Sequence, residues 1–197
     1  MTVAMQRQAL RAGLWLHLHR GVLALAGTPD TPARRLWAGH LALGPSSIVS
    51  HRGAVWSWSL GKTKLLDEVE FSVPRNARGD HPDFVIHRTG PLTRRDFRYR
   101  DGLPVTSPLR TLVDAGAVIP LADLEDVFDR VIATQLASPP DVLRELEGAA
   151  KRGRAGCGAL RAVLLQQGLG SDRSPSYLEA KALRLFRRHG LPEPRSS

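Results

Sequence analysis

The chain has 197 residues, of which 42% are hydrophobic, and a formal net charge of +9. Length and composition are those of a globular protein with one or two small domains, and every apolar run is far shorter than the roughly 18 residues of a membrane span. A single cysteine, Cys157, excludes an internal disulfide and indicates a reducing compartment. Because the N-terminus also lacks the pattern of a secretory signal, we expect a cytoplasmic protein that is not associated with a membrane.

The positive charge is unevenly distributed along the chain. Residues 1–60 carry +5, residues 61–119 carry +2, residues 120–150 carry −5 and residues 151–197 carry +7. Arginine outnumbers lysine by 24 to 4, which a GC-rich genome also produces, so the total charge is weak support for any partner. The separation into basic and acidic blocks has no such explanation. A basic N-terminal region favours binding to a phosphate backbone through counterion release.

The N-terminal region predicts a short helix followed by a hairpin. Residues 5–12 have a helical pattern, and residues 15–19 alternate apolar and polar as in a strand. Arg20-Gly21 is a turn, and residues 22–26 form a second strand. A helix followed by such a hairpin is typical of the end of a winged helix. Thr31-Pro32 then begins a longer helix.

The middle of the chain predicts a small mixed or antiparallel sheet with helices. Its expected strands are 48–49, 69–73, 84–88, 97–100 and 103–105. Ser50 begins a helix that extends to about Leu60, and Asp101-Gly102 is a strong hairpin turn. Because proline cannot donate to a strand ladder, Pro104 predicts that the last strand lies at a sheet edge.

The remainder of the chain has helical patterns. One expected helix begins at Pro108 and another at Pro139. Three more are expected over residues 121–132, 160–165 and 175–189. The helix 121–132 has an apolar stripe on one face and acidic residues on the other. Residues 151–158 are basic and rich in glycine, so they are the best linker candidate. We expect an α/β (α+β) fold with a reduced N-terminal winged helix, a small mixed sheet and a helical C-terminal region.

Six short sequence motifs follow one another in a characteristic order. They are 18–22, 49–52, 69–75, 85–88, 101–106 and 108–114. This series resembles the AbiEi-type antitoxin family of type IV toxin–antitoxin systems, in its actinobacterial form, over roughly residues 6–119 and more loosely to 165. The resemblance implies an N-terminal winged helix that binds the promoter, an α/β domain that supports the antitoxin function, and a cognate toxin as a possible partner.

Two departures from the family pattern shape the expected domains. Between Gly13 and Trp15 the family has a further helix, the one that enters the major groove, and here only Leu14 remains. The segment 174–192 resembles the first helix of a Vsr-like, PD-(D/E)XK-like endonuclease domain, and the chain stops after it. The expected parts are therefore a reduced winged helix, an antitoxin domain, a basic linker with a helix, and a truncated endonuclease-like helix. Their bounds are 1–30, 31–150, 151–173 and 174–197.

A catalytic site is not expected. In the endonuclease-like segment, Glu179 is a lone carboxylate, whereas a Mg²⁺-dependent nuclease needs several that converge on the ion. We do not expect Ser50, His51 and Asp114 to form a triad, because adjacent side chains on a helix are expected to point apart. We therefore expect a protein that is not an enzyme and has no cofactor.

Several basic residues are candidates for contacts with DNA phosphates. They are Arg7, Arg11, His17, His19, Arg20, Arg34 and Arg35. His17 and His19 share one face of the expected strand, but two ligands are too few for a metal site, so none is expected. We expect Trp56 and Trp58 to pack in the core and not on a base.

The function that these patterns favour is a DNA-associated, antitoxin-like transcriptional regulator without catalysis. One alternative is an inactive remnant of a protein with an endonuclease domain. Another is a module that docks a toxin or other protein through the acidic helix 120–133, without DNA binding. In addition, Arg110 and Asp114 are four residues apart and are expected to form a surface or interdomain salt bridge.

Overall fold

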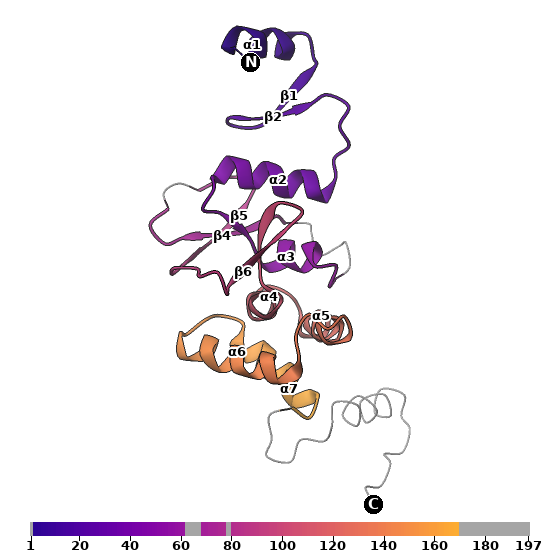
Figure 1. Ribbon diagram of the computed structural model, residues 1–197, viewed down its shortest axis with the longest axis vertical. Helices are drawn as coiled ribbons and strands as arrows, with labels where there is room; N and C mark the ends of the chain where they lie inside the picture. The colour runs from indigo at the N-terminus through magenta and orange to yellow at the C-terminus, as the bar shows by residue number, and fades with distance from the viewer. Residues whose placement is uncertain (1, 62–67, 78–79, 170–197) are drawn as a thin grey trace, which may run out of the picture. The chain divides into compact units, whose positions relative to one another are not determined.

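The structure is a computed structural model that describes residues 2–61, 68–77 and 80–169 (Figure 1). It confirms the α+β class. The chain divides into two compact units, Met1–Ser57 with Thr63–Thr106, and Trp58–Lys62 with Ser107–Ser197. This division differs from the expected boundaries after residues 30 and 150. The expected domain 174–197, with its helix and Glu179, lies outside the described residues.

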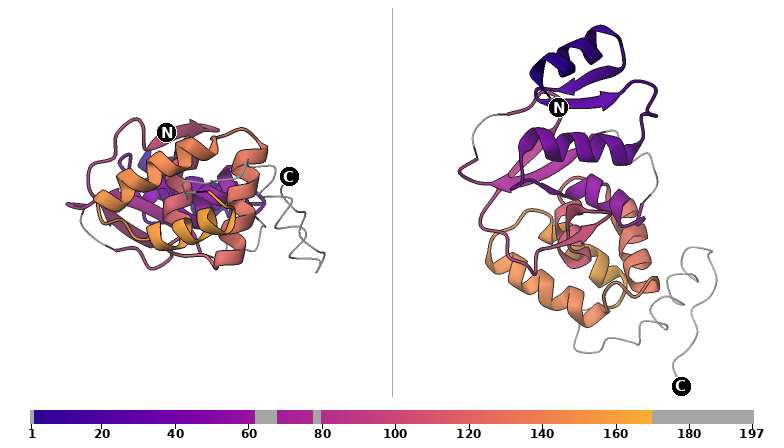
Figure 2. Two further views of the ribbon diagram at one scale, coloured as in Figure 1. Left: turned by 90° about the horizontal axis from the view of Figure 1, so that it is seen from below. Right: turned by 45° about the horizontal axis from the view of Figure 1, so that its top comes forward.

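The first unit begins with helix α1 (Val3–Arg11), which leads directly into the hairpin of β1 (Trp15–His19) and β2 (Val22–Leu25). The right view of Figure 2 shows α1 alongside the hairpin, and α1 contacts β1. No helix stands between α1 and β1, as the sequence predicts. The two strands are antiparallel.

Helix α2 (Pro32–Leu43) follows the hairpin and has the predicted cap, since the Thr31 hydroxyl accepts from the N–H of Arg34. It is followed by the two-residue strand β3 (Ile48–Val49) and by α3 (His51–Ser57). Helix α3 ends three residues before the expected limit at Leu60. Ser59, just beyond it, has a left-handed backbone, with a φ of 57°.

A five-stranded mixed sheet forms the body of the first unit. Its other strands are β4 (Glu70–Pro74), β5 (Val85–Thr89), β6 (Phe97–Arg100) and β7 (Leu103–Thr106). The order is β5-β4-β3-β7-β6; β4–β5 and β3–β7 are parallel, and β3–β4 and β6–β7 are antiparallel. Val49, Phe71 and Val105 are buried in its core.

The expectation that Pro104 lies in an edge strand is wrong. Strand β7 lies between β3 and β6, and β6 is at the edge. The physical reason is the shortness of β3. It pairs with β7 at the single position Val49–Val105, one residue beyond Pro104, so the missing N–H of the proline costs no bond to β3.

The second unit contains the helices α4 (Pro108–Ala115), α5 (Leu121–Ala133), α6 (Pro139–Lys151) and α7 (Cys157–Gln166). Helices α6 and α7 are coloured orange in the left view of Figure 2. Both helices contact α4 as well as each other, and α5 packs on α7. The expected linker 151–158 is therefore largely a turn inside this unit and not a connection between domains.

The predicted pair of Arg110 and Asp114 forms, with Nε and Oδ1 2.7 Å apart. It is not at the surface, however, because the two side chains are only 5% and 6% exposed. Helix α4 is covered by α5, α6 and α7, which sequence patterns do not reveal. A buried pair of this kind is costly to break by removal of one partner.

Within the described residues, no helix combines the length and the apolar character needed to cross a bilayer.

Candidate nucleic-acid interface

Helix α1 and the hairpin present an exposed basic surface. Arg7, Arg11 and Arg20 are all exposed, and the first 29 residues contain no Asp or Glu. Arg7 and Arg11 are four residues apart on α1, so they share one face of that helix. Arg20 stands at the turn between β1 and β2, next to Gly21. These three are the exposed arginines of the predicted phosphate-binding set that form no ion pair with the described residues.

A Schellman motif fixes the angle between α1 and the hairpin. Gly13 has the left-handed φ of 68° that the motif requires. The N–H of Leu14 then donates to Ala9 O at 3.0 Å, and that of Gly13 to Leu10 O at 3.1 Å. The carbonyl of Leu14 accepts from Ala26 N at 2.9 Å, which ties the same residue to the end of the hairpin. Helix α1 and the hairpin are thus joined by backbone hydrogen bonds.

Arg34 and Arg35 of the predicted set are held by an acidic neighbour. Asp30 Oδ1 lies 3.0 Å from Arg34 Nη2, and Oδ2 lies 2.5 Å from Arg35 Nη2. The hydrogen bond from Arg35, together with the charges of both arginines, lowers the pKa of the Asp30 carboxyl below its usual value. The three side chains therefore present one net positive charge, which makes Arg34 and Arg35 weaker candidates than the arginines of α1.

The two histidines of the predicted set have different surroundings. His17 is exposed, whereas the side chain of His19 is only 13% exposed and lies 3.2 Å from Asp83 Oδ2. The pairing of β1 with β2 changes register between the two histidines, as at a β-bulge. A bulge breaks the alternation of side chains, so the expectation that both lie on one face of the strand fails.

Strand β6 carries basic residues that the sequence patterns did not single out. Arg98 and Arg100 are exposed, and Tyr99 between them is 71% exposed. The alternation Phe97-Arg98-Tyr99-Arg100 is the signal that could have found them, but it also fits an ordinary edge strand. Exposed aromatic and cationic side chains on one strand suit stacking on unpaired bases.

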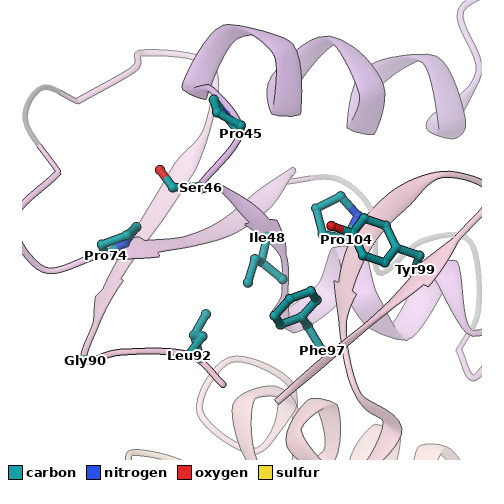
Figure 3. Close-up of a pocket in the computed structure, with 9 residues that line it drawn as sticks. All are labelled: Pro45, Ser46, Ile48, Pro74, Gly90, Leu92, Phe97, Tyr99 and Pro104. Atoms are coloured by element: carbon teal, nitrogen blue, oxygen red, sulfur yellow. The ribbon is translucent and has the colours of Figure 1, made fainter. Parts of the chain in front are cut away.

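A cavity of about 240 Å³ lies beside β6 (Figure 3). The residues that line it carry no formal charge. They are Pro45, Ser46, Ile48, Pro74, Gly90, Leu92, Phe97, Tyr99 and Pro104. The cavity therefore suits an apolar group and offers nothing to hold a phosphate or a metal ion.

A buried polar cluster surrounds Glu70 of β4. This carboxylate has no exposed surface; Oε1 lies 2.6 Å from Arg52 Nη1, and Oε2 lies 2.5 Å from His87 Nε2. The ring of His51 stacks on that of His87 with centroids 3.5 Å apart. The expectation that the side chains of Ser50 and His51 point apart is wrong, because Ser50 Oγ lies 2.8 Å from His51 Nδ1. Burial opposes ionisation of Glu70, but the hydrogen bonds from His87 and Arg52 outweigh it and hold the pKa of the carboxyl below its usual value. Since Arg52 already balances this charge, the cluster is suited to holding α3 on the sheet.

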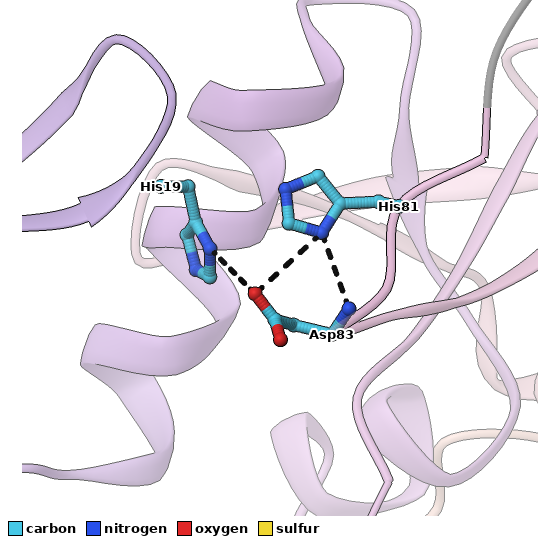
Figure 4. A group of neighbouring side chains, drawn as sticks. All are labelled: His19, His81 and Asp83. Atoms are coloured by element: carbon cyan, nitrogen blue, oxygen red, sulfur yellow. Dashed lines mark hydrogen bonds and ion pairs between the residues drawn. The ribbon is translucent and has the colours of Figure 1, made fainter.

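Two groups of side chains in the described residues have the donor atoms for a metal ion. One is His51, Glu70 and His87 of the cluster just described, and the other is His19, His81 and Asp83 (Figure 4). In each group, the ligand atoms lie within 4.8 Å of one another. Sequence reasoning missed both, because neither group is made from neighbours along one element.

No family model matches this chain, and neither does any curated protein. Among solved structures, the RV2827C protein from Mycobacterium tuberculosis is similar, with a TM-score of 0.58 and 18% sequence identity. The match covers 92% of this chain and 68% of that chain. At this identity the likeness shows a shared fold.

Proposed function

We propose that the protein is a DNA-associated regulator of the AbiEi antitoxin type, which acts by binding and not by chemistry. The observation that carries this proposal is the exposed basic surface of α1 and the hairpin, with Arg7, Arg11 and Arg20 and no acidic residue in the first 29 positions. The resemblance of the six sequence motifs to AbiEi antitoxins is the basis for proposing a regulatory role and a possible toxin partner.

Contacts with phosphates explain how this surface would work. Each phosphate neutralised by an arginine releases counterions, so the logarithm of the binding constant falls by about 0.9 per contact for each tenfold rise in salt. Three contacts from α1 and the hairpin would give a slope of about −2.7. Because no further helix stands between α1 and the hairpin, we expect a promoter duplex and a random duplex to bind within a few-fold of each other.

Removal of the two α1 arginines should weaken DNA binding more than removal of two arginines from α2. The double variant Arg7→Ala/Arg11→Ala should reduce the steepness of the salt slope by about 1.8, since two contacts are lost. Alanine is the best helix former, so α1 itself should persist. A salt-titrated gel shift or fluorescence anisotropy with a short duplex measures both quantities.

The matched control is Arg34→Ala/Arg35→Ala, which removes the same formal charge. Because Asp30 already binds both of these guanidinium groups, we expect less than half of the change in slope. An equal loss in both double variants would mean that the overall charge attracts DNA and that α1 has no special role. No loss in the α1 variant would refute the proposed surface.

The proposal also predicts that the protein does not cut DNA. Purified protein with Mg²⁺ or Mn²⁺ should leave supercoiled plasmid intact over hours, at a protein concentration that saturates binding. A Glu179→Ala variant is the control for a contaminating nuclease, because a contaminant is unaffected by it. Cleavage that disappears in this variant would support the endonuclease alternative.

A further inference from the structure

Three potential ligands from distant parts of the first unit meet beside the hairpin. His19 belongs to β1, while His81 and Asp83 belong to the loop before β5. Asp83 Oδ2 lies 3.2 Å from His19 Nδ1 and 3.8 Å from His81 Nδ1 (Figure 4). The carboxylate stands between the two imidazole rings, which is the arrangement in which one cation can reach all three donors.

The protein itself provides weak partners for these donor atoms. His19 Nδ1 is buried and makes no hydrogen bond of good geometry, although the carboxylate oxygen of Asp83 is near. His81 Nδ1 only accepts a long bond of 3.3 Å from the backbone N–H of Asp83. A buried polar nitrogen without a hydrogen bond is costly, and a bound ion would remove that cost.

Phe84 holds the two imidazoles in place. The rings of His19 and Phe84 meet edge to face at 4.7 Å between centroids, and the ring of His81 stacks on Phe84 at 4.4 Å. The ligands of a metal site need such outer support, because their orientation must be fixed before the ion binds. One aromatic residue next to Asp83 therefore positions both histidines.

The cavity beside this group leaves room for a further ligand. It has a volume of about 330 Å³, and its lining includes His19, Asp83 and the bound pair Asp30 and Arg34. An ion held by three protein ligands would keep an open coordination position toward water in this space.

The second group with suitable donors is a poorer site. Glu70 already receives hydrogen bonds from both Arg52 and His87, so an ion there would have to displace a guanidinium group. The exposed carboxylate of Asp83 has no arginine or lysine among its described ion pairs. Electrostatics therefore favours the group at the hairpin.

We propose that His19, His81 and Asp83 bind a divalent transition-metal ion of the zinc class. Two imidazoles and one carboxylate suit Zn²⁺, Co²⁺ or Ni²⁺, whereas Mg²⁺ and Ca²⁺ prefer oxygen ligands alone. The ion links strand β1 to the loop before β5, and so fixes the hairpin on the sheet. The proposal does not depend on DNA binding and can be tested without DNA.

The test is titration of untagged protein with Co²⁺, followed by its visible absorption, and with Zn²⁺ in competition with a chromophoric chelator. Wild-type protein should bind stoichiometrically, and Zn²⁺ should raise its melting temperature. Removal of a direct ligand, as in Asp83→Asn or His81→Ala, should weaken binding by more than the roughly 10- to 100-fold loss typical of outer-shell partners. The rise in melting temperature should disappear in the same variants.

Two control variants leave the proposed ligands intact. Asp80→Asn removes a carboxylate from the same loop that is 85% exposed and pairs with Arg88, and His17→Ala removes the exposed histidine of the same strand. Both should bind Co²⁺ and Zn²⁺ like the wild type. Absence of stoichiometric binding in the wild type, equal affinity in Asp83→Asn, or binding that depends on His87 and not on His81 would each overturn the proposal.

Discussion

Replacement of Gly156 by alanine should destabilise the second unit by about 4 kcal/mol, the range in which single substitutions have a specific structural cause. Gly156 has a left-handed φ of 88°, which an L side chain rarely adopts. A Cβ atom at this position would also lie 2.0 Å from the carbonyl oxygen of Val113 and 2.8 Å from Ala117 N. Both neighbours are backbone atoms at the end of α4, so no flexible side chain can move aside. Strain and overlap therefore add together, and α7 must separate from α4.

Two other glycines of the same region provide the controls for this substitution. Gly153 has a φ of 62° but open space around its Cβ position, so Gly153→Ala should cost only about 1 kcal/mol. Gly158 is inside α7, also with open space, and Gly158→Ala should stabilise by up to about 1 kcal/mol. Urea denaturation followed by circular dichroism compares the three variants. Equal costs for Gly156→Ala and Gly153→Ala would mean that α7 does not pack on α4 as described.

The contrast between these glycines also shows what local sequence can reveal. Residues 151–158 look like a linker because they are basic and contain three glycines. Glycine occurs both in flexible connections and where two backbones approach closely, and composition does not distinguish the two cases. The difference depends on Val113 and Gly116, which are some forty residues away along the chain. Local signals were reliable where the cause was local, as in the Thr31 cap.

The candidate sites could likewise be predicted only where the interacting residues are close together in the sequence. The exposed arginines of α1 and the hairpin could be predicted, because a charged residue on a short amphipathic helix usually faces solvent. The ion pairs of Arg34 and Arg35 involve Asp30, four and five residues away, and local spacing could have suggested them. The group of His19, His81 and Asp83 could not be predicted, because it requires the β-bulge in β1 and the placement of a loop more than sixty residues later.

Replacement of Arg52 by methionine should cost about 3 kcal/mol at neutral pH, because it removes one partner of a buried charge. Glu70 has no exposed surface, and Arg52 Nη1 lies 2.6 Å from its Oε1. Methionine retains much of the aliphatic stem of arginine, so packing should change little. The expected loss is therefore the cost of a buried carboxylate that keeps its contact with His87 but no longer has its contact with Arg52. Urea denaturation at pH 7 measures it.

The dependence of stability on pH follows from the lowered pKa of Glu70. When the folded pKa lies below the unfolded one, the unfolded chain binds more protons between the two values, so stability falls as the solution becomes more acid. The contribution of Glu70 is complete above the unfolded pKa of about 4.3 and is lost as the pH falls through the folded pKa. Loss of Arg52 raises the folded pKa of Glu70, so the variant should lose its remaining stability at a higher pH than the wild type.

The double variant Arg52→Met/Glu70→Gln separates the charge from the packing. With a neutral amide in place of the carboxylate, no buried charge is left without its arginine, and at least about 1 kcal/mol of the loss should be recovered at pH 7. The double variant should also lack the part of the acid transition that Glu70 contributes. If it is no more stable than Arg52→Met alone, the arginine stabilises the sheet through its stem or through Glu68, 3.2 Å away, and not through the charge of Glu70.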